Sequence, residues 1–171
     1  MIFLTVGTHE PFDRLVQAVD NWCRAADCGG HVFGQITRRA RYHPSQFEWT
    51  AQLSPRAFLE RCHGADFIVS HAGMGSIITA LMLVKPVLVV PRRAMLGETR
   101  NDHQLTTARR FRDRPGIWVA EDEDQLSEML TKIRSSGRPT VDTGPALTPF
   151  AQPELSIAIR DFIFKSGEFG K

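Results

Sequence analysis

Residues 67–90 read FIVSHAGMGSIITALMLVKPVLVV, and this stretch decides the fold. A β-branched run at 67–70 leads through a glycine-containing turn into a helical segment at 77–84, and a second apolar run follows at 87–90. Two apolar strands joined by one helix make a βαβ unit, in which the strands are parallel and the crossover is right-handed. The stretch therefore predicts an α/β fold with a parallel sheet.

The same alternation of strands and helices extends to both sides of this unit. Residues 2–6 form an apolar run that stops at Gly7-Thr8, and apolar side chains recur at helical spacing over 12–23. Ser54-Pro55 has the pattern of an N-cap followed by proline in the first helical turn. The other predicted elements are strands over 31–36, 47–50 and 117–119, a helix over 103–112 capped by Asn101 or Asp102, and a helix from Asp122 to about 134.

The length of 171 residues fits one domain with one substantial core. We predict a single Rossmann-like domain over 1–134, with a mostly parallel sheet flanked by helices. Residues 135–153 are rich in Gly, Pro, Ser and Thr, which predicts a linker. Residues 154–165 predict a final helix whose apolar stripe packs either on this domain or on a partner subunit.

Composition excludes several classes of protein. A net charge of +2, without aromatic residues interleaved among the arginines, does not indicate nucleic-acid binding. Apolar runs are too short to cross a bilayer, so we expect a cytoplasmic protein. Cys23, Cys28 and Cys62 are odd in number and irregularly spaced, which favours reduced, buried thiols over disulfides or a zinc site.

The turn from Ser70 to Ser76 is the leading candidate for a ligand site. It joins a buried strand to a helix at the carboxyl end of the sheet, where ligands of open α/β sheets bind. Gly73 and Gly75 free the backbone to approach an anion, and Ser76 adds a hydroxyl and an N-cap for the helix expected near Ile77. That helix contributes unpaired N–H groups and its positive dipole end, which suit a diphosphate. A tight turn needed only for close packing is the structural alternative.

Two common nucleotide motifs fail at this turn. Ile78 stands where the third glycine of a dinucleotide fingerprint belongs, and no Gly-Lys-Ser/Thr of a P-loop follows. A nicotinamide-dependent oxidoreductase is therefore disfavoured.

A second polar cluster follows the strand at 87–90. It contains Glu98, Asn101, Asp102, His103 and Gln104. Loops after adjacent parallel strands lie side by side, so these groups are placed to hydrogen-bond the hydroxyls of a sugar whose diphosphate sits at the glycine turn. Helix capping by Asn101 or Asp102, with the other side chains exposed, is the alternative for the same residues.

These motifs, in this order, resemble the C-terminal domain of glycosyltransferase family 28, especially its stand-alone Alg13-like and PssE-like members. The resemblance spans residues 1–119 and rests on five stretches: 5–9, 12–15, 70–77, Lys85-Pro86 and 102–104. It implies the donor-binding half of a GT-B glycosyltransferase, with a UDP-sugar as donor and inverting transfer.

The resemblance also implies partners. A membrane-associated, Alg14-like or PssD-like subunit would bind a lipid-linked saccharide acceptor in exopolysaccharide or capsule synthesis, and would recruit this chain to the inner face of the membrane. No cofactor is expected, and no metal, since the chain has no DxD-like pair of carboxylates. A non-catalytic nucleotide-sugar-sensing or regulatory subunit is the alternative function.

The resemblance assigns roles to residues by position. His71, Gly73, Gly75 and Ser76 would hold the diphosphate. Thr8 and His9 would face the cleft from the first loop, and His103 and Gln104 would approach the sugar. Thr79 stands where many relatives have an acidic residue that binds ribose. Apart from the resemblance, Glu98 and Asp102 of the polar cluster are further candidates for donor binding, and His9 is a local candidate for the catalytic base.

Overall fold

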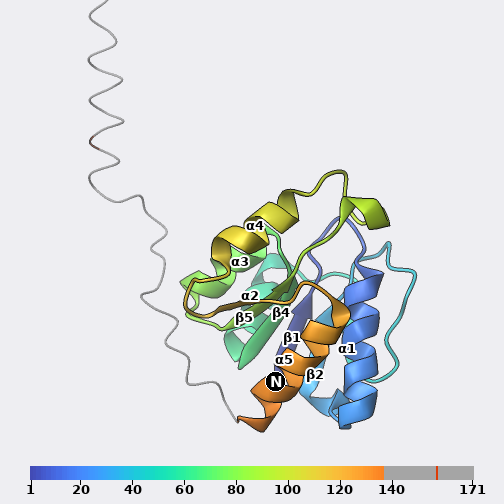
Figure 1. The fold of residues 1–171 in the computed structure, drawn as a ribbon. Coiled ribbons are helices and arrows are strands. Elements are labelled where there is room, and N and C mark those ends of the chain that lie inside the picture. Colours follow the sequence, from blue (N-terminus) through green and yellow to red (C-terminus); the bar gives the residue numbers. More distant parts are fainter. Residues whose placement is uncertain (137–156, 158–171) are drawn as a thin grey trace, which may run out of the picture.

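The computed structural model describes residues 1–136 and 157; the predicted linker and final helix lie outside this part except for 135, 136 and 157. Six parallel strands form one sheet within the described residues, in the order β3-β2-β1-β4-β5-β6 (Figure 1). The strands are β1 (Ile2–Thr5), β2 (Val32–Gln35), β3 (Glu48–Thr50), β4 (Phe67–His71), β5 (Val87–Val90) and β6 (Ile117–Val119).

The strand order reverses direction at the centre of the sheet. β1 pairs with β2 on one side and with β4 on the other, so that Leu4 has Gly34 and Val69 as its neighbours. This is the doubly wound arrangement, in which ligands bind at the carboxyl ends of the strands where the order reverses. The predicted α/β class and Rossmann-like sheet are confirmed, and every described strand pair is parallel.

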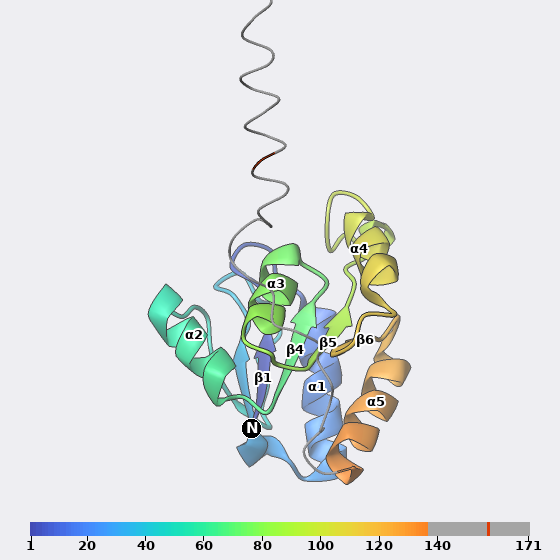
Figure 2. The same ribbon diagram turned by 90° about the vertical axis from the view of Figure 1, so that its left-hand side faces the viewer.

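Helices cover both faces of the sheet and produce three layers (Figures 1 and 2). α1 and α5 lie on one face, while α2, α3 and α4 lie on the other. The helices are α1 (Asp13–Ala26), α2 (Pro55–Gly64), α3 (Met74–Met82), α4 (His103–Phe111) and α5 (Glu123–Ser135), with short 3-10 turns η1 (Gly29–His31) and η2 (Ala94–Leu96).

Alternate strand residues supply the two cores. Phe67 and Val69 of β4 pack toward α1 and α5, whereas Ile68 between them packs toward α3 with Ile77. Successive side chains of a strand point to opposite faces, so an uninterrupted apolar run is what a strand covered on both sides requires.

Helix α3 begins earlier than its sequence indicates. The predicted start near Ile77 is wrong, because Met74 is already helical and Gly73 is the N-cap, with the Ile77 amide donating to the Gly73 carbonyl at 3.2 Å. Glycine is a poor helix former, and the glycines therefore appeared to lie outside the helix. Gly75 and Ser76 belong to its first turn, and Ser76 does not cap it.

The other predicted N-caps can be compared directly with the hydrogen bonds. Ser54 accepts from the Ala57 amide at 3.2 Å and Asp122 from the Gln125 amide at 2.9 Å, which confirms both caps. Before α4, the side chain of Asn101 accepts from the His103 amide, while that of Asp102 accepts from the Ala94 amide.

The three cysteines are free and buried, as predicted. Burial raises the pKa of the Cys62 thiol to about 11. Among the described residues, no helix is both long and apolar enough to span a bilayer.

A buried carboxylate fixes the long connection between β2 and β3. Asp20 on α1 is fully buried and accepts from the Tyr42 hydroxyl at 2.6 Å and from the amides of Ser45 and Gln46 at 3.0 and 2.8 Å. Burial alone would raise the pKa of Asp20, but these hydrogen bonds hold it below its usual value. The carboxylate thereby ties the connection to α1.

We expect Tyr42→Phe to lower the free energy of unfolding by about 2 kcal/mol, the usual size for a hydrogen bond to a charged group. Urea unfolding followed by circular dichroism measures the change. Ser45→Ala removes a longer, 3.4 Å contact with the same carboxylate and should cost less. Equal stability of wild type and Tyr42→Phe would contradict the anchoring role of Asp20.

Candidate functional site

A cavity of about 730 Å³ opens at the carboxyl edge of the sheet, a volume typical of small-molecule sites. The loop after β1, the first turns of α2 and α3, and the start of α4 form its walls. It lies where the segments that follow β1 and β4 separate, since α1 and α3 leave toward opposite faces. Eight predicted site residues line it: Thr8, His9, His71, Gly75, Ser76, Thr79, His103 and Gln104.

The N-terminus of α3 faces this cavity through Gly75 and Ser76. The N–H groups of a first helical turn have no partner within the helix, and no side chain caps this one. A Cβ atom built on Gly75 meets nothing within 4 Å, so this glycine leaves open space beside the unpaired amides. Thr79 stands one turn on, and its hydroxyl donates to the Gly75 carbonyl at 2.8 Å. The geometry suits an anion that receives backbone hydrogen bonds.

The His71 ring is enclosed by two glycines. A Cβ on Gly73 would lie 2.1 Å from Nε2 of His71, and a Cβ on Gly7 would lie 3.0 Å from Cε1. Gly7 also has a φ of +86°, which favours glycine. Gly73 does not line the cavity; its lack of a side chain makes room for His71. The turn thus serves packing at Gly73 and leaves free space at Gly75.

The electrostatic surroundings keep His71 neutral. Burial and the positive charge of Arg92 lower the pKa of its imidazole to about 4, against a hydrogen bond with the Thr5 backbone that favours the charged form. A neutral imidazole offers one N–H donor and one acceptor nitrogen.

Arg92 is a charged residue of the cavity wall that motif analysis missed. Its side chain is 5% exposed, and its terminal nitrogen donates to the carbonyls of Val6 at 2.8 Å and Glu10 at 2.6 Å. Its own amide donates to Oε1 of Gln104, which is also buried. Arginine is common on surfaces, and its burial here depends on long-range packing between β5 and the first loop. The hydrogen bond from the Arg92 amide to the Gln104 side chain could not be predicted from the spacing of these two residues in the sequence.

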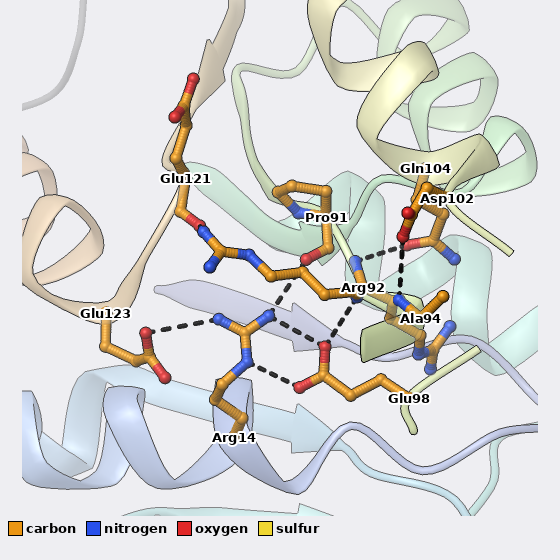
Figure 3. A network of polar contacts seen from close by, with 10 residues as sticks. Arg14, Pro91, Arg92, Ala94, Glu98, Asp102, Gln104, Glu121 and Glu123 are labelled. Carbon is orange, nitrogen blue, oxygen red and sulfur yellow. Dashed lines mark hydrogen bonds and ion pairs between the residues drawn. The ribbon is translucent and has the colours of Figure 1, made fainter. Parts of the chain in front are cut away.

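The loop after β5 is held by a network of polar contacts that includes two further predicted residues, Glu98 and Asp102 (Figure 3). Arg14 of α1 donates from Nε and a terminal nitrogen to the two oxygens of Glu98, at 2.6 and 3.0 Å, and Glu98 also accepts from the Arg93 amide. Arg14 reaches Glu123 as well, at 3.3 Å. Although burial opposes it, the carboxylate neighbours raise the pKa of Arg14.

Glu98 and Asp102 consequently do not line the cavity. Both oxygens of Glu98 are bonded within the protein, and Asp102 Oδ1 accepts from the Ala94 amide at 2.9 Å (Figure 3). Asp102 borders a smaller hollow of about 260 Å³ instead. These contacts indicate that Glu98 and Asp102 shape the loop after β5. They do not support the predicted contact of either side chain with a sugar.

The other two predicted histidines lie at the cavity wall and are exposed. Nδ1 of His9 is 2.9 Å from the Thr8 hydroxyl, and Nδ1 of His103 contacts Oδ1 of Asn101. His9 keeps its second ring nitrogen for a ligand, as a candidate base requires.

The side of the cavity toward α2 is apolar and was not predicted. Leu53, Phe58 and Leu59 line it, together with the buried amide of Gln35. Gln35 donates to the Gly7 carbonyl and accepts from the Leu53 amide, both at 3.1 Å, so it joins the first loop to the start of α2. Within the described residues, no group of three or more His, Cys, Asp or Glu side chains is placed to hold a metal ion.

The fold and the site together define a doubly wound α/β domain with a cavity of small-molecule size at the carboxyl edge of its sheet, and comparison with known proteins gives its family. The model of the glycosyltransferase family 28 C-terminal domain matches residues 1–140. The chain belongs to this family.

Individual relatives agree with the family. The chain is similar to the UDP-N-acetylglucosamine transferase subunit ALG13 of Eremothecium gossypii, with 39% identity over 69 residues, which are 40% of this chain and 32% of that protein. It therefore matches only about a third of this relative's length.

Solved structures show the shared fold. MurG of Acinetobacter baumannii matches with a TM-score of 0.64 and 16% identity, over 95% of this chain and 49% of that one. The glycotransferase of kitacinnamycin matches with a TM-score of 0.57 and 19% identity, over 78% of this chain and 34% of that one. An NMR structure of ALG13 matches with a TM-score of 0.55 and 19% identity, over 95% of this chain and 96% of that one.

The low pKa of His71 makes stability depend on pH. In the unfolded chain the imidazole binds a proton below its usual pKa of 6.5, whereas in the folded protein it does so only near 4. As pH falls from about 6.5 to 4, the unfolded state takes up more protons, and we expect this histidine to remove up to about 3 kcal/mol from the free energy of unfolding.

Urea unfolding across this window tests the expectation. His71→Asn should lose less stability than wild type over the same change of pH, and His63→Asn, at an exposed position of α2, should behave as wild type. Parallel curves for wild type and His71→Asn would show that His71 does not titrate differently on folding.

Proposed function

We propose that this chain binds a nucleotide-diphosphate sugar, with a UDP-sugar as the expected donor, for inverting glycosyl transfer. The observation that carries the proposal is the uncapped first turn of α3, open at Gly75, facing a cavity at the point where the strand order reverses. Family membership supports glycosyl transfer as the reaction.

The cavity has distinct regions that suit the parts of such a ligand. The diphosphate would accept hydrogen bonds from the amides of Gly75 and Ser76, with the Ser76 hydroxyl beside them. The sugar would extend toward His103 and Gln104, as the sequence predicts. The nucleoside would then lie on the opposite side, where Leu53 and Phe58 offer apolar surface to its base.

The reaction would displace the nucleoside diphosphate from the anomeric carbon when an acceptor hydroxyl attacks. Negative charge grows on the leaving diphosphate, and the amides and dipole of α3 stabilise that charge because they are oriented before the reaction starts. The acceptor hydroxyl must lose its proton; His9 at the cavity wall is the candidate base within this chain.

The cavity is lined by one domain, whereas a GT-B site lies between two. We propose that a membrane-associated, Alg14-like or PssD-like subunit supplies the second wall and binds a lipid-linked saccharide, and that the complex acts in exopolysaccharide or capsule synthesis. The similar ALG13 protein is named as a subunit of a transferase, which supports a partner for this chain.

Replacement of Gly75 tests donor binding without disturbing the fold. A side chain at Gly75 meets no protein atom within 4 Å and would project beside the amides of α3. Gly75→Leu should therefore abolish UDP binding measured by calorimetry, while its circular dichroism and unfolding midpoint stay close to those of wild type.

Gly30→Leu is the matched control, because a Cβ at Gly30 also meets nothing within 4 Å and this residue does not line the cavity. It should bind UDP as wild type does. If Gly75→Leu also bound UDP normally, the diphosphate could not lie at the first turn of α3.

A further inference from the structure

Arg92 carries a buried charge for which the described part of the chain provides no ion-pair partner. Ion pairs in this part join other residues, and none includes Arg92. Its Nε is buried without a hydrogen-bond partner among the described residues. Thr37 and Arg114 also have such an atom, but neither lines the cavity, whereas Arg92 does.

The nearest acidic groups do not neutralise this charge. Glu98 interacts with Arg92 electrostatically, but its two oxygens are bonded to Arg14. Glu10 is exposed, and it is the backbone carbonyl of this residue that accepts from Arg92. Burial lowers the pKa of Arg92, yet a guanidinium remains charged in proteins.

An unmatched charge inside a protein is costly, and buried charges are normally paired. Here the charge lies at the wall of a cavity, beside a neutral His71, where an anionic ligand would complete the pair. A negatively charged ligand bound in the cavity would supply this partner and offset the free-energy cost of burying the Arg92 charge.

We propose that Arg92 is the fixed positive charge that selects the diphosphate over less charged ligands, an assignment that rests on the proposed function. The carbonyls of Val6 and Glu10 orient one end of the guanidinium, and Gln104 holds its backbone. The side chain therefore does not need to reorganise when the anion enters. Arg92 is a specificity-determining residue that acts mainly through its charge.

A purely structural role makes different predictions. If Arg92 only fixed the first loop, its loss would weaken all ligands of the cavity alike, and lysine, which lacks the planar fork, would fail as badly as glutamine. If its charge matters, lysine should preserve much of the preference for a diphosphate, and glutamine should not.

Calorimetry with UDP, UMP and uridine separates the two roles. We expect R92Q to weaken UDP binding by roughly 10- to 100-fold, the loss typical of a charged hydrogen bond, and uridine binding much less. R92K should keep a clear preference for UDP over uridine. R93Q is the matched control, since it removes the same charge from the neighbouring residue, whose guanidinium bonds the Glu121 carbonyl; it should bind UDP as wild type does.

A second readout follows the His71 imidazole by NMR. Arg92 lowers the pKa of His71, so R92Q should raise it above the wild-type value of about 4, and R93Q should not. R92M replaces R92Q if the latter does not fold.

Equal loss of UDP and uridine affinity in R92Q, or equal UDP affinity in R92Q and wild type, would overturn the role of Arg92. Failure of the proposed function would look different, because the wild-type chain itself would then bind neither UDP nor uridine.

Discussion

The parallel pairing of β1 with β4 is the constraint on which the site depends. The two strands lie side by side along their whole length, but their following helices leave toward opposite faces of the sheet, α1 to one and α3 to the other. The loops at their carboxyl ends must therefore separate. The cavity between them is a consequence of topology, and several of its polar groups lie at or just after the ends of β1 and β4, among them Thr8, His71 and Ser76.

Topology opens the cavity, and the first residues of α1 then fix its surroundings. Asp13 accepts from the Arg41 amide in the connection between β2 and β3, while Arg14 holds Glu98 in the loop after β5. Two long loops from different strands are thus attached to adjacent residues of one helix. This attachment explains why the side chain of Glu98, a charged residue in a loop, is only 11% exposed: it is held by its ion pair with Arg14.

The fold could be predicted largely from sequence because β-branched runs and helical spacing are local signals, as 67–70 and 87–90 illustrate. The start of α3 could not, because glycine is a poor helix former, yet Gly73 is the N-cap of α3 and Gly75 lies in its first turn. In the site, motif order identified His71, Ser76 and His103 as cavity residues. Arg92 and Gln35 were missed because their burial results from contacts between distant segments, and Glu98 was placed at the cavity because spacing does not reveal an ion pair with Arg14.

The contrast between Arg14 and Arg92 shows how the protein uses charge. Both guanidinium carbons lie near the ring centre of Phe12, at 5.1 and 5.0 Å, and this ring is almost fully buried. Arg14 is matched by Glu98 and Glu123, which makes it a structural clamp. Because Glu98 is engaged by Arg14, it is not available to pair with Arg92. Among the described residues, the ion pair of Arg14 with Glu98 that shapes the loop after β5 thereby also leaves Arg92 without an ion-pair partner at the cavity, which is the condition that the proposed role of Arg92 requires.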